Sequence, residues 1–376
     1  MGGHVGRPGA GFCPVRGHSN VQGDRTVGIW EAAPVSFIKK MEQGLNITIP
    51  KEHGYDVVNA IHAMKDGKVD VFFCMGGNFI SATPDTFATA DGLRKVGLTV
   101  QVSTKLNRSH LVTGDEAIIL PCLGRTEIDV QRSGEQFVTV ENSMGIVHQS
   151  RGGLQPASQQ LRSEPWIVSN LSNHLFDESP LNWLELSDNY DSIRDLMELS
   201  LNGFQDYNMR VRQENGFLLP NPPRDSRSFD TPSGKAQFTT HDLPNVSIPS
   251  DRFVMMTIRS HDQYNTTIYD VHDRYRGISG NRRIVLMNAL DMAERGWKNR
   301  QIVSISSHFN GEVRTSTDWI VVAYDIPRQN VATYFPEANS LVPLNSTARI
   351  SNTPTSKWIE VSLKSEPFEQ KGAEEE

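Results

Sequence analysis

The sequence predicts an α/β body followed by a small β-barrel. Between residues 57 and 121, strand-like apolar runs alternate with helix-like segments, and one strand ends in a Gly-rich turn. This order is typical of a parallel sheet, whose ligands bind beyond the carboxyl ends of the strands. After about residue 250 the segments are shorter and richer in β-forming residues, which favours a barrel with few helices.

The predicted body contains two helices and three strands before its mostly helical second half. Apolar residues at helical spacing predict helices over 57–67 and 85–97, and short β-rich runs predict strands over 68–78, 98–105 and 117–121. The first thirty residues are rich in Gly, Pro, Asn and Asp, which predicts an ordered loop, with a frayed tail as the alternative. The stretch over 151–245 predicts helices and loops, with an amphipathic helix over 192–204 and a Pro-rich connector over 216–238 that ends in a strand.

The predicted barrel follows a boundary placed near residues 240–250. Its expected strands cover 253–259, 301–307, 313–322 and 358–363, and one short helix covers 286–296. The sequence therefore predicts a body over 1–245, a barrel domain over 246–366 and a frayed tail over 367–376.

Composition excludes several classes of protein. With 37% hydrophobic and 22% charged residues among 376, wholesale disorder is excluded. A net charge of −7 argues against duplex nucleic acid as a partner, and no apolar stretch reaches the roughly 20 residues needed for a membrane span. Cys13, Cys74 and Cys122 form no C-x-x-C pair, so they supply neither a Cys-only iron–sulfur site nor a zinc site. They indicate a reducing, cytoplasmic setting.

Two short motifs follow predicted strands and suit phosphate binding. MGGN at 75–78 lets backbone N–H groups approach a phosphate, although it is neither GxGxxG nor a Walker A loop, and a plain tight turn is the alternative. STKLNRSH at 103–110 offers hydroxyl, Lys and Arg donors to phosphate or sugar oxygens, with an exposed polar loop as the alternative.

Two further segments are too polar for a core. The stretch over 257–283 is dense in His, Arg, Asn and Gln, which predicts a ligand carrying phosphates, ribose and a base. His261 and His272 raise the alternative of a metal site, but no recognised ligand spacing appears. The stretch over 330–358 predicts an ordered loop near a ligand, and the carboxylates of Glu127 and Asp129 are interpreted as an exposed strand edge.

Eight segments, taken in order, resemble the carboxyl-terminal half of molybdopterin oxidoreductases, in the formate dehydrogenase alpha-subunit-like (YdeP-like) branch. They are PVRGHSNVQGD, FCMGGNF, STKLNRSH, LPCLGRTEID, VENSMG, FDTPSGKAQF, TIRSHDQYNTTIY and YFPEANSLVPL. The resemblance implies a molybdenum atom held by two molybdopterin guanine dinucleotides, buried between an α/β body and a six-stranded barrel. It also implies oxidation of formate or a similar small anion.

The resemblance assigns cofactor contacts to particular positions. They are Gly17, Asn20, Gln22 and Gly23 after the Arg segment; Met75, Gly76, Gly77 and Asn78 at one strand end; Ser103, Thr104, Lys105 and Asn107 at the next; and Thr257, Arg259, His261, Gln263, Tyr264, Asn265, Asn339 and Lys357 in the barrel. In formate dehydrogenases the second strand-end loop opens with an Asp that accepts hydrogen bonds from guanine. Ser103 stands there in this chain, which puts guanine readout by this loop in question.

Arg16 is the residue that the resemblance places beside substrate. PVRGHSNVQG resembles the formate dehydrogenase segment PxRGxxNVQG, whose Arg orients the substrate carboxylate, and a guanidinium suits that contact. A cofactor or structural contact is the alternative for Arg16.

The departures from the family concern what lies upstream. In the family, the molybdenum ligand and any 4Fe-4S cysteines precede the Arg-Gly segment, and Cys13 is too close to Arg16 to be that ligand. The expectation is a partial protein that needs an amino-terminal half or a complementary subunit. It is expected to contribute no metal ligand of its own. The sequence does not identify the electron acceptor. The second hypothesis is a non-catalytic chain that binds a guanine dinucleotide or a partner, and the third is a related oxidoreductase with another substrate.

Overall fold

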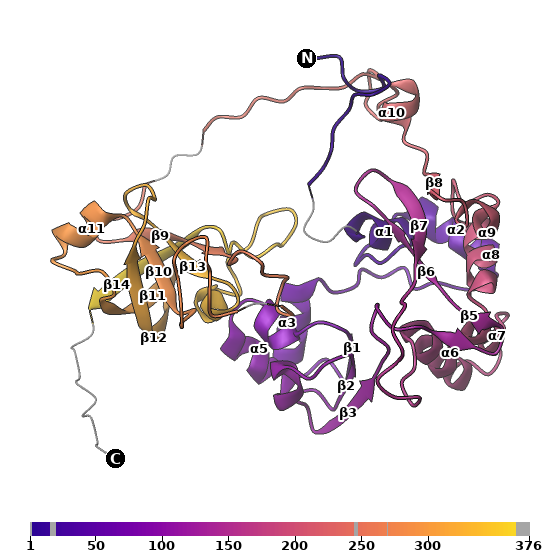
Figure 1. Cartoon of the computed structure of the whole chain (residues 1–376), viewed down its shortest axis with the longest axis horizontal. Helices are drawn as coiled ribbons and strands as arrows, with labels where there is room; N and C mark the ends of the chain where they lie inside the picture. The colour runs from indigo at the N-terminus through magenta and orange to yellow at the C-terminus, as the bar shows by residue number, and fades with distance from the viewer. Residues whose placement is uncertain (1, 16–19, 244–246, 269, 366–376) are drawn as a thin grey trace. The chain divides into compact units, whose positions relative to one another are not determined.

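The computed structural model describes residues 2–15, 20–243, 247–268 and 270–365 (Figure 1). The chain packs into two compact units: a helix-rich unit, Met1–Gly54 with Pro121–Leu243, and a barrel unit, Tyr55–Leu120 with Pro244–Glu376. The segment over 55–120 is thus grouped with the barrel, and the division into 1–245 and 246–366 stays a prediction. Arg16, Gly17 and the expected tail over 367–376 lie outside the described residues.

The first part of the barrel unit is a small parallel α/β layer. In chain order it contains α3 (Val57–Lys65), β1 (Val71–Met75), α4 (Phe79–Ala82), α5 (Thr86–Leu93), β2 (Leu98–Ser103), η1 (Arg108–Leu111) and β3 (Glu116–Pro121). The sheet order is β1–β2–β3, and β1 runs parallel to β2 with Met75 opposite Val102. Helix α3 begins where the Asp56 carboxylate accepts the N–H groups of Val58 and Asn59. The predicted helices and strands of this layer are confirmed.

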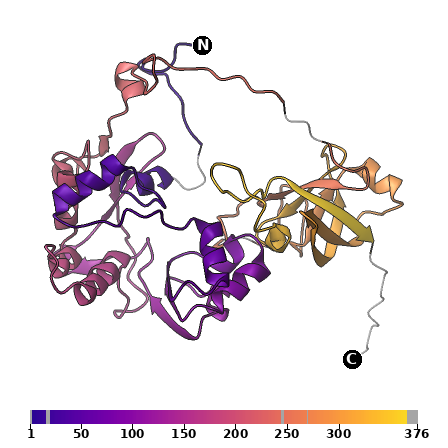
Figure 2. The same cartoon turned by 180° about the vertical axis from the view of Figure 1, so that it is seen from behind.

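The second part of the barrel unit is a closed six-stranded barrel in the order β10–β12–β11–β14–β9–β13. The elements are β9 (Phe253–Ile258), β10 (Ile284–Met287), α11 (Ala289–Glu294), β11 (Ile302–Phe309), β12 (Glu312–Ala323), β13 (Asn330–Tyr334), η2 (Glu337–Leu341) and β14 (Ile359–Ser365). Strand β14, yellow in Figure 2, pairs antiparallel with both β9 and β11. Closure pairs each strand on both sides, so the barrel predicted from short β-rich segments is confirmed.

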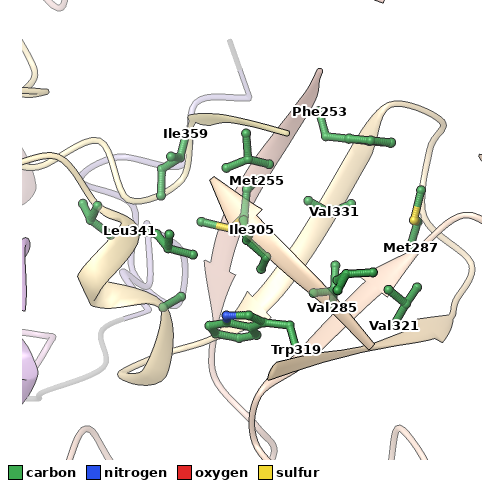
Figure 3. Packing of buried hydrophobic residues seen from close by; sticks show 14 of the residues in the cluster. Phe253, Met255, Val285, Met287, Ile305, Trp319, Val321, Val331, Leu341 and Ile359 are labelled. Carbon is green, nitrogen blue, oxygen red and sulfur yellow. The ribbon is translucent and has the colours of Figure 1, made fainter. Parts of the chain in front are cut away.

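Inward-facing residues of the strands fill the barrel. On β11, Val303, Ile305 and Ser307 are buried and alternate with partly exposed residues, because side chains alternate between the two faces of a strand. Trp319 is fully buried, and its indole N–H donates to the Ser316 hydroxyl at 3.0 Å. Figure 3 shows the packing of Phe253, Met255, Val285, Met287, Ile305, Trp319, Val321, Val331, Leu341 and Ile359.

The α/β layer is joined to the barrel by buried polar contacts. The Asp85 carboxylate caps α5 by accepting the N–H of Ala88 at 3.2 Å, and it also accepts from Arg314 Nε of β12 at 2.7 Å. Asn339 of η2 donates its side-chain amide to the Ser81 carbonyl at 2.7 Å, and its carbonyl accepts the Asp85 N–H at 2.9 Å. These contacts explain why the two parts pack as one unit.

Four predictions of local structure were wrong. Within the first thirty residues, which were predicted to form a loop, Val21–Thr26 form helix α1. Residues 286–287 belong to strand β10, so the helix predicted over 286–296 is shortened to α11. The loop predicted over 330–358 begins with strand β13 and continues into η2. The strand predicted at the end of 216–238 does not form, since the described residues there are irregular after α10 (Pro222–Ser226).

The helix-rich unit carries two small hairpins among its helices. Its elements are α1 (Val21–Thr26), α2 (Val35–Leu45), β4 (Val130–Gln131), β5 (Gly134–Glu135), β6 (Val138–Glu141), β7 (Ile146–Ser150), α6 (Glu164–Leu175), α7 (Trp183–Asp188), α8 (Tyr190–Ser200), α9 (Tyr207–Arg210), β8 (Phe217–Leu218) and α10. Strands β6, β7 and β8 form one sheet, and its core includes Phe137, Val147, Phe204, Tyr207 and Phe217. Within the described residues, every helix of the chain is too short or too polar to cross a bilayer.

Candidate functional site

A polar cavity of about 380 Å³ lies at the carboxyl ends of β1 and β2 in the barrel unit. Three segments line it: Gly76, Gly77 and Asn78; Ser103, Thr104, Lys105, Leu106, Asn107 and Arg108; and Thr266 and Thr267 of the loop after β9. The structure therefore brings together the two strand-end motifs that the sequence singled out. It adds Thr266 and Thr267, which the sequence placed in a polar segment but did not single out.

The turn after β1 depends on glycine. Gly76 and Gly77 have φ angles of +68° and +76°, a left-handed conformation that disfavours residues with a Cβ. The Gly76 N–H donates to the Val102 carbonyl at 2.8 Å, which holds the turn against β2. A Cβ placed on Gly77 would meet no protein atom within 4 Å. The backbone here is accordingly open to a ligand, as a phosphate-binding turn requires.

The two strand-end loops are fixed to each other by side-chain amides and a hydroxyl. Asn107 donates its side-chain amide to the Gly77 carbonyl at 2.8 Å. Ser109 is fully buried, and its hydroxyl donates to the Asn78 amide oxygen at 3.1 Å while accepting the Ile80 N–H at 3.1 Å. Asn78 and Asn107 thus shape the cavity wall, and Ser109 is a supporting residue that the sequence prediction missed.

The charge of the cavity lining suits an anion. Lys105, on the loop after β2, and Arg108, at the start of η1, are exposed cations. The lining residues that the structure describes include no carboxylate. Hydroxyls come from Ser103, Thr104 and the two threonines of the barrel loop. Ammonium, guanidinium, hydroxyl and glycine N–H groups are the donors that phosphate oxygens accept from. The donor set therefore fits the phosphate-bearing part of a nucleotide cofactor.

The segment over 257–283 is organised around the buried carboxylate of Asp273. It accepts from Arg276 Nη1 at 2.6 Å, from the Tyr334 hydroxyl at 2.9 Å and from His261 Nδ1 at 3.1 Å. Burial alone would raise the pKa of Asp273, but these three donors outweigh it and lower the pKa to about 2. The ring of Tyr275 lies against His261, with centroids 4.5 Å apart. Some of the polar side chains of this segment therefore stabilise the fold of the segment itself.

A second polar centre in the same segment is Arg282, a buried residue of the turn before β10. Its guanidinium donates to Glu337 Oε1 at 2.8 Å, to the Ser260 hydroxyl at 2.9 Å and to the Phe335 carbonyl at 2.8 Å. Gln263 joins this centre, because its amide oxygen accepts from Arg282 and its amide N–H donates to the Phe335 carbonyl. Gln263 therefore stabilises the loop, and its cofactor contact stays a prediction.

Among the remaining barrel positions predicted to bind the cofactor, Thr257, Arg259 and Lys357 lie near one another. Lys357 donates to the carbonyl of Thr257, and burial together with the nearby charge of Arg259 lowers the pKa of Lys357. Arg259 itself is exposed beside the Phe335 ring. Tyr264 and Asn265 lie in the tight turn before Thr266, where Asn265 has a φ of +48°. Met75 and Asn339 lie outside the cavity lining, and their cofactor contacts stay predictions.

Asn20, Gln22 and Gly23 lie in the helix-rich unit, on or just before α1. The Asn20 amide oxygen accepts the Glu141 N–H at 2.8 Å, and Gln22 Nε2 donates to the Glu141 carbonyl at 2.6 Å. Thr26 adds a hydrogen bond to the Glu141 carboxylate at 2.7 Å. The NVQG and VENSMG motifs therefore meet on strand β6, where they anchor α1.

The carboxylates of Glu127 and Asp129 do not form an exposed edge. Glu127 is half-buried and accepts the N–H groups of Gly124 at 2.5 Å and Ala157 at 2.9 Å. Asp129 accepts the Tyr190 hydroxyl at 2.6 Å. Both carboxylates therefore hold loops together, which corrects the interpretation drawn from the sequence. Across the described ranges, no group of three or more His, Cys, Asp or Glu side chains is placed to hold a metal ion.

Comparison with known proteins identifies the barrel. Residues 253–360 match the family described as the molydopterin dinucleotide binding domain. An uncharacterized oxidoreductase of Mycobacterium tuberculosis is 52% identical over 96% of this chain and 47% of its own length. Protein YdeP of Escherichia coli is 42% identical over 96% of this chain and 48% of its own length. Acetylene hydratase from Pelobacter acetylenicus shares the fold, with a TM-score of 0.60 at 12% identity over 91% of this chain and 51% of that one.

The chain thus spans about half the length of the relatives it matches. The matched domain begins with β9 and ends in β14, so it coincides with the closed barrel. The chain contains the molydopterin dinucleotide binding domain, and these matches support its assignment to the molybdopterin oxidoreductase family.

Proposed function

We propose that this chain holds the cofactor of a molybdenum oxidoreductase that carries two molybdopterin guanine dinucleotides and oxidises formate or a similar small anion. The observation that supports this most is the cavity beyond β1 and β2, where the Gly77 backbone, several hydroxyls and two cations converge. When bound, the cofactor would supply a metal centre that takes up two electrons from substrate. Any 4Fe-4S cluster would be bound by residues upstream of this chain.

The chain's own residues would divide between the two dinucleotides. Gly77, Lys105 and Arg108 would bind the phosphates of one, Gly77 through its backbone N–H and the two cations through charge-assisted hydrogen bonds. Arg259 and Lys357 would bind the other. Burial and, after it, the charge of Arg259 lower the pKa of Lys357, so the two cations lie near each other. Both groups of residues lie in the barrel unit.

The experiment is co-expression of this chain with the amino-terminal half of a full-length relative in a molybdenum-replete host. We expect stoichiometric molybdenum and guanine nucleotide in the purified complex. The double variant Lys105→Ala/Arg108→Ala should weaken cofactor binding by roughly thirtyfold and lower both contents, because each cation contributes about 1 kcal/mol to phosphate binding. The matched control Lys298→Ala removes an exposed cation outside the cavity and should change neither. Absence of molybdenum and nucleotide from the complex would contradict the proposal and favour a non-catalytic, partner-binding chain.

The variant Arg16→Ala in the same complex tests whether Arg16 contacts the substrate. If Arg16 pairs with the substrate carboxylate, kcat/KM for formate should fall by roughly tenfold to a hundredfold while molybdenum content stays near that of the wild type. Arg7→Ala, which removes another Arg from the same amino-terminal stretch, is the matched control. Unchanged kinetics for Arg16→Ala would remove its substrate role, and loss of molybdenum would assign it to the cofactor instead.

A further inference from the structure

The wall of the cavity contains a histidine–serine pair whose hydrogen atoms can be assigned. His110, the last but one residue of η1, places Nε2 3.2 Å from the hydroxyl of the buried Ser103. Its Nδ1 lies 3.0 Å from the backbone N–H of Asn107 and 3.2 Å from the Asn107 carbonyl. These contacts join the imidazole to both ends of the loop after β2.

The direction of each hydrogen bond follows from the donors available. A backbone N–H can only donate, so Nδ1 of His110 must accept from Asn107. The Asn107 carbonyl already accepts the His110 backbone N–H, which removes the need for a proton on Nδ1. In the neutral ring the proton therefore sits on Nε2 and is donated to Ser103 Oγ. This bond uses one lone pair of Ser103 Oγ, and it leaves the Ser103 hydroxyl hydrogen available to a ligand in the cavity.

The side chains that face the cavity are consequently biased towards donation. Lys105 and Arg108 only donate, and the contact with His110 leaves the Ser103 hydroxyl hydrogen available for donation. The hydroxyls of Thr104, Thr266 and Thr267 can also donate, and the described lining residues carry no carboxylate. The amide oxygens of the lining are engaged within the protein: Asn78 Oδ1 accepts from Ser109, and Asn107 Oδ1 accepts the Ser109 N–H at 2.9 Å. Phosphate oxygens are acceptors only, whereas the N1–H and amino group of a guanine require an acceptor such as a carboxylate.

We propose that this cavity selects the diphosphate of its ligand and is indifferent to the nucleotide base, with His110 and Ser103 as its specificity-determining pair. The inference rests on the proposed function, since it takes the ligand to be the nucleotide end of the cofactor. Guanine would then be present because the cofactor carries it, and not because this cavity reads it.

The test uses the purified full chain and three probes: inorganic pyrophosphate, GDP and CDP, with binding measured by titration calorimetry. We expect GDP and CDP to bind with Kd values within about threefold of each other, and pyrophosphate to compete with both. Ser103→Asp should weaken pyrophosphate binding by about tenfold or more, because it places a negative charge among the phosphate donors, and it should create a preference for GDP. His110→Gln keeps an acceptor for the Asn107 N–H and should weaken all three probes equally. Ser250→Asp, an exposed position outside the cavity lining, is the matched charge control.

Three results would overturn the inference: wild-type binding of GDP more than tenfold tighter than CDP, no effect of Ser103→Asp, or no binding of any probe. None of them decides the proposed function, which depends on molybdenum and nucleotide in the co-expressed complex. If the complex holds both while GDP is strongly preferred, only the base-indifferent cavity fails. If the complex holds neither while the probes bind as expected, the proposed function fails and the diphosphate site remains.

Discussion

Asp273→Asn should lower the free energy of unfolding of the barrel unit by about 3 kcal/mol. The carboxylate is buried and accepts hydrogen bonds from Arg276, Tyr334 and His261. An asparagine would turn an N–H₂ group towards at least one of these donors, and it would leave the partly buried guanidinium without its counter-charge. Removal of one partner from a buried ion pair typically costs about 3–5 kcal/mol. Urea denaturation followed by intrinsic fluorescence measures the loss.

The same substitution should remove a defined part of the pH dependence of the free energy of unfolding. The pKa of Asp273 lies near 2 in the folded chain, below its ordinary value of 3.8. A depressed folded pKa means that the charged carboxylate stabilises the fold fully above pH 4, and that this contribution is lost as the pH falls towards 2. The difference in unfolding free energy between wild type and Asp273→Asn should therefore be constant from pH 7 to 5 and shrink between pH 4 and 2.

Asp262→Asn is the control for this experiment. Asp262 lies in the same segment and also pairs with an arginine, Arg274, but both side chains are mostly exposed. Surface ion pairs contribute about 0–1 kcal/mol, so this variant should unfold close to wild type with an unchanged acid profile. Equal losses for the two variants would contradict the role of Asp273 as the centre of the loop.

Much of the fold could be predicted because its elements carry local signals. Strands β1 and β2 end in turn motifs, and helix α5 follows an Asp that caps it. Strand β10 was misread because all four residues of Ile284–Met287 are buried, so it shows no alternation and merges with the apolar start of α11. Strand β13 was hidden for the same reason, since four of its five residues are buried inside a Pro- and Asn-rich stretch.

Only those residues of the candidate site that follow neighbouring strands of the parallel sheet could be predicted from the sequence. The motifs at Gly76 and Ser103 follow neighbouring parallel strands, so their meeting at one edge follows from the fold class. Thr266 reaches the same cavity only because the barrel packs on the α/β layer, which no spacing within the sequence encodes. The pairing of His110 with Ser103 depends likewise on the turn of η1, and the burial of Asp273 on contacts from β13.

Asp85→Ala should lower the free energy of unfolding of the barrel unit by about 4 kcal/mol, because three effects act at one residue. The variant loses the cap of α5, which is typically worth about 1 kcal/mol. It places alanine at a φ of +47°, a left-handed conformation that costs about 1–2 kcal/mol outside Gly, Asn and Asp. It also removes the carboxylate that accepts from Arg314 at 2.7 Å, across the junction between the α/β layer and the barrel.

Two further variants separate these effects. Asp85→Asn keeps the cap and tolerates the left-handed backbone, so it should lose only about 1–2 kcal/mol, the share due to the charge beside Arg314. Glu312→Gln removes the other partner of Arg314, a mostly exposed carboxylate, and should cost less than about 1 kcal/mol. If Asp85→Ala were no more destabilising than Glu312→Gln, the junction would not depend on Asp85. The expected order instead ties the cavity wall to the barrel, because the Asp85–Arg314 contact helps to hold the α/β layer, which carries Gly77, against the barrel, which carries Thr266.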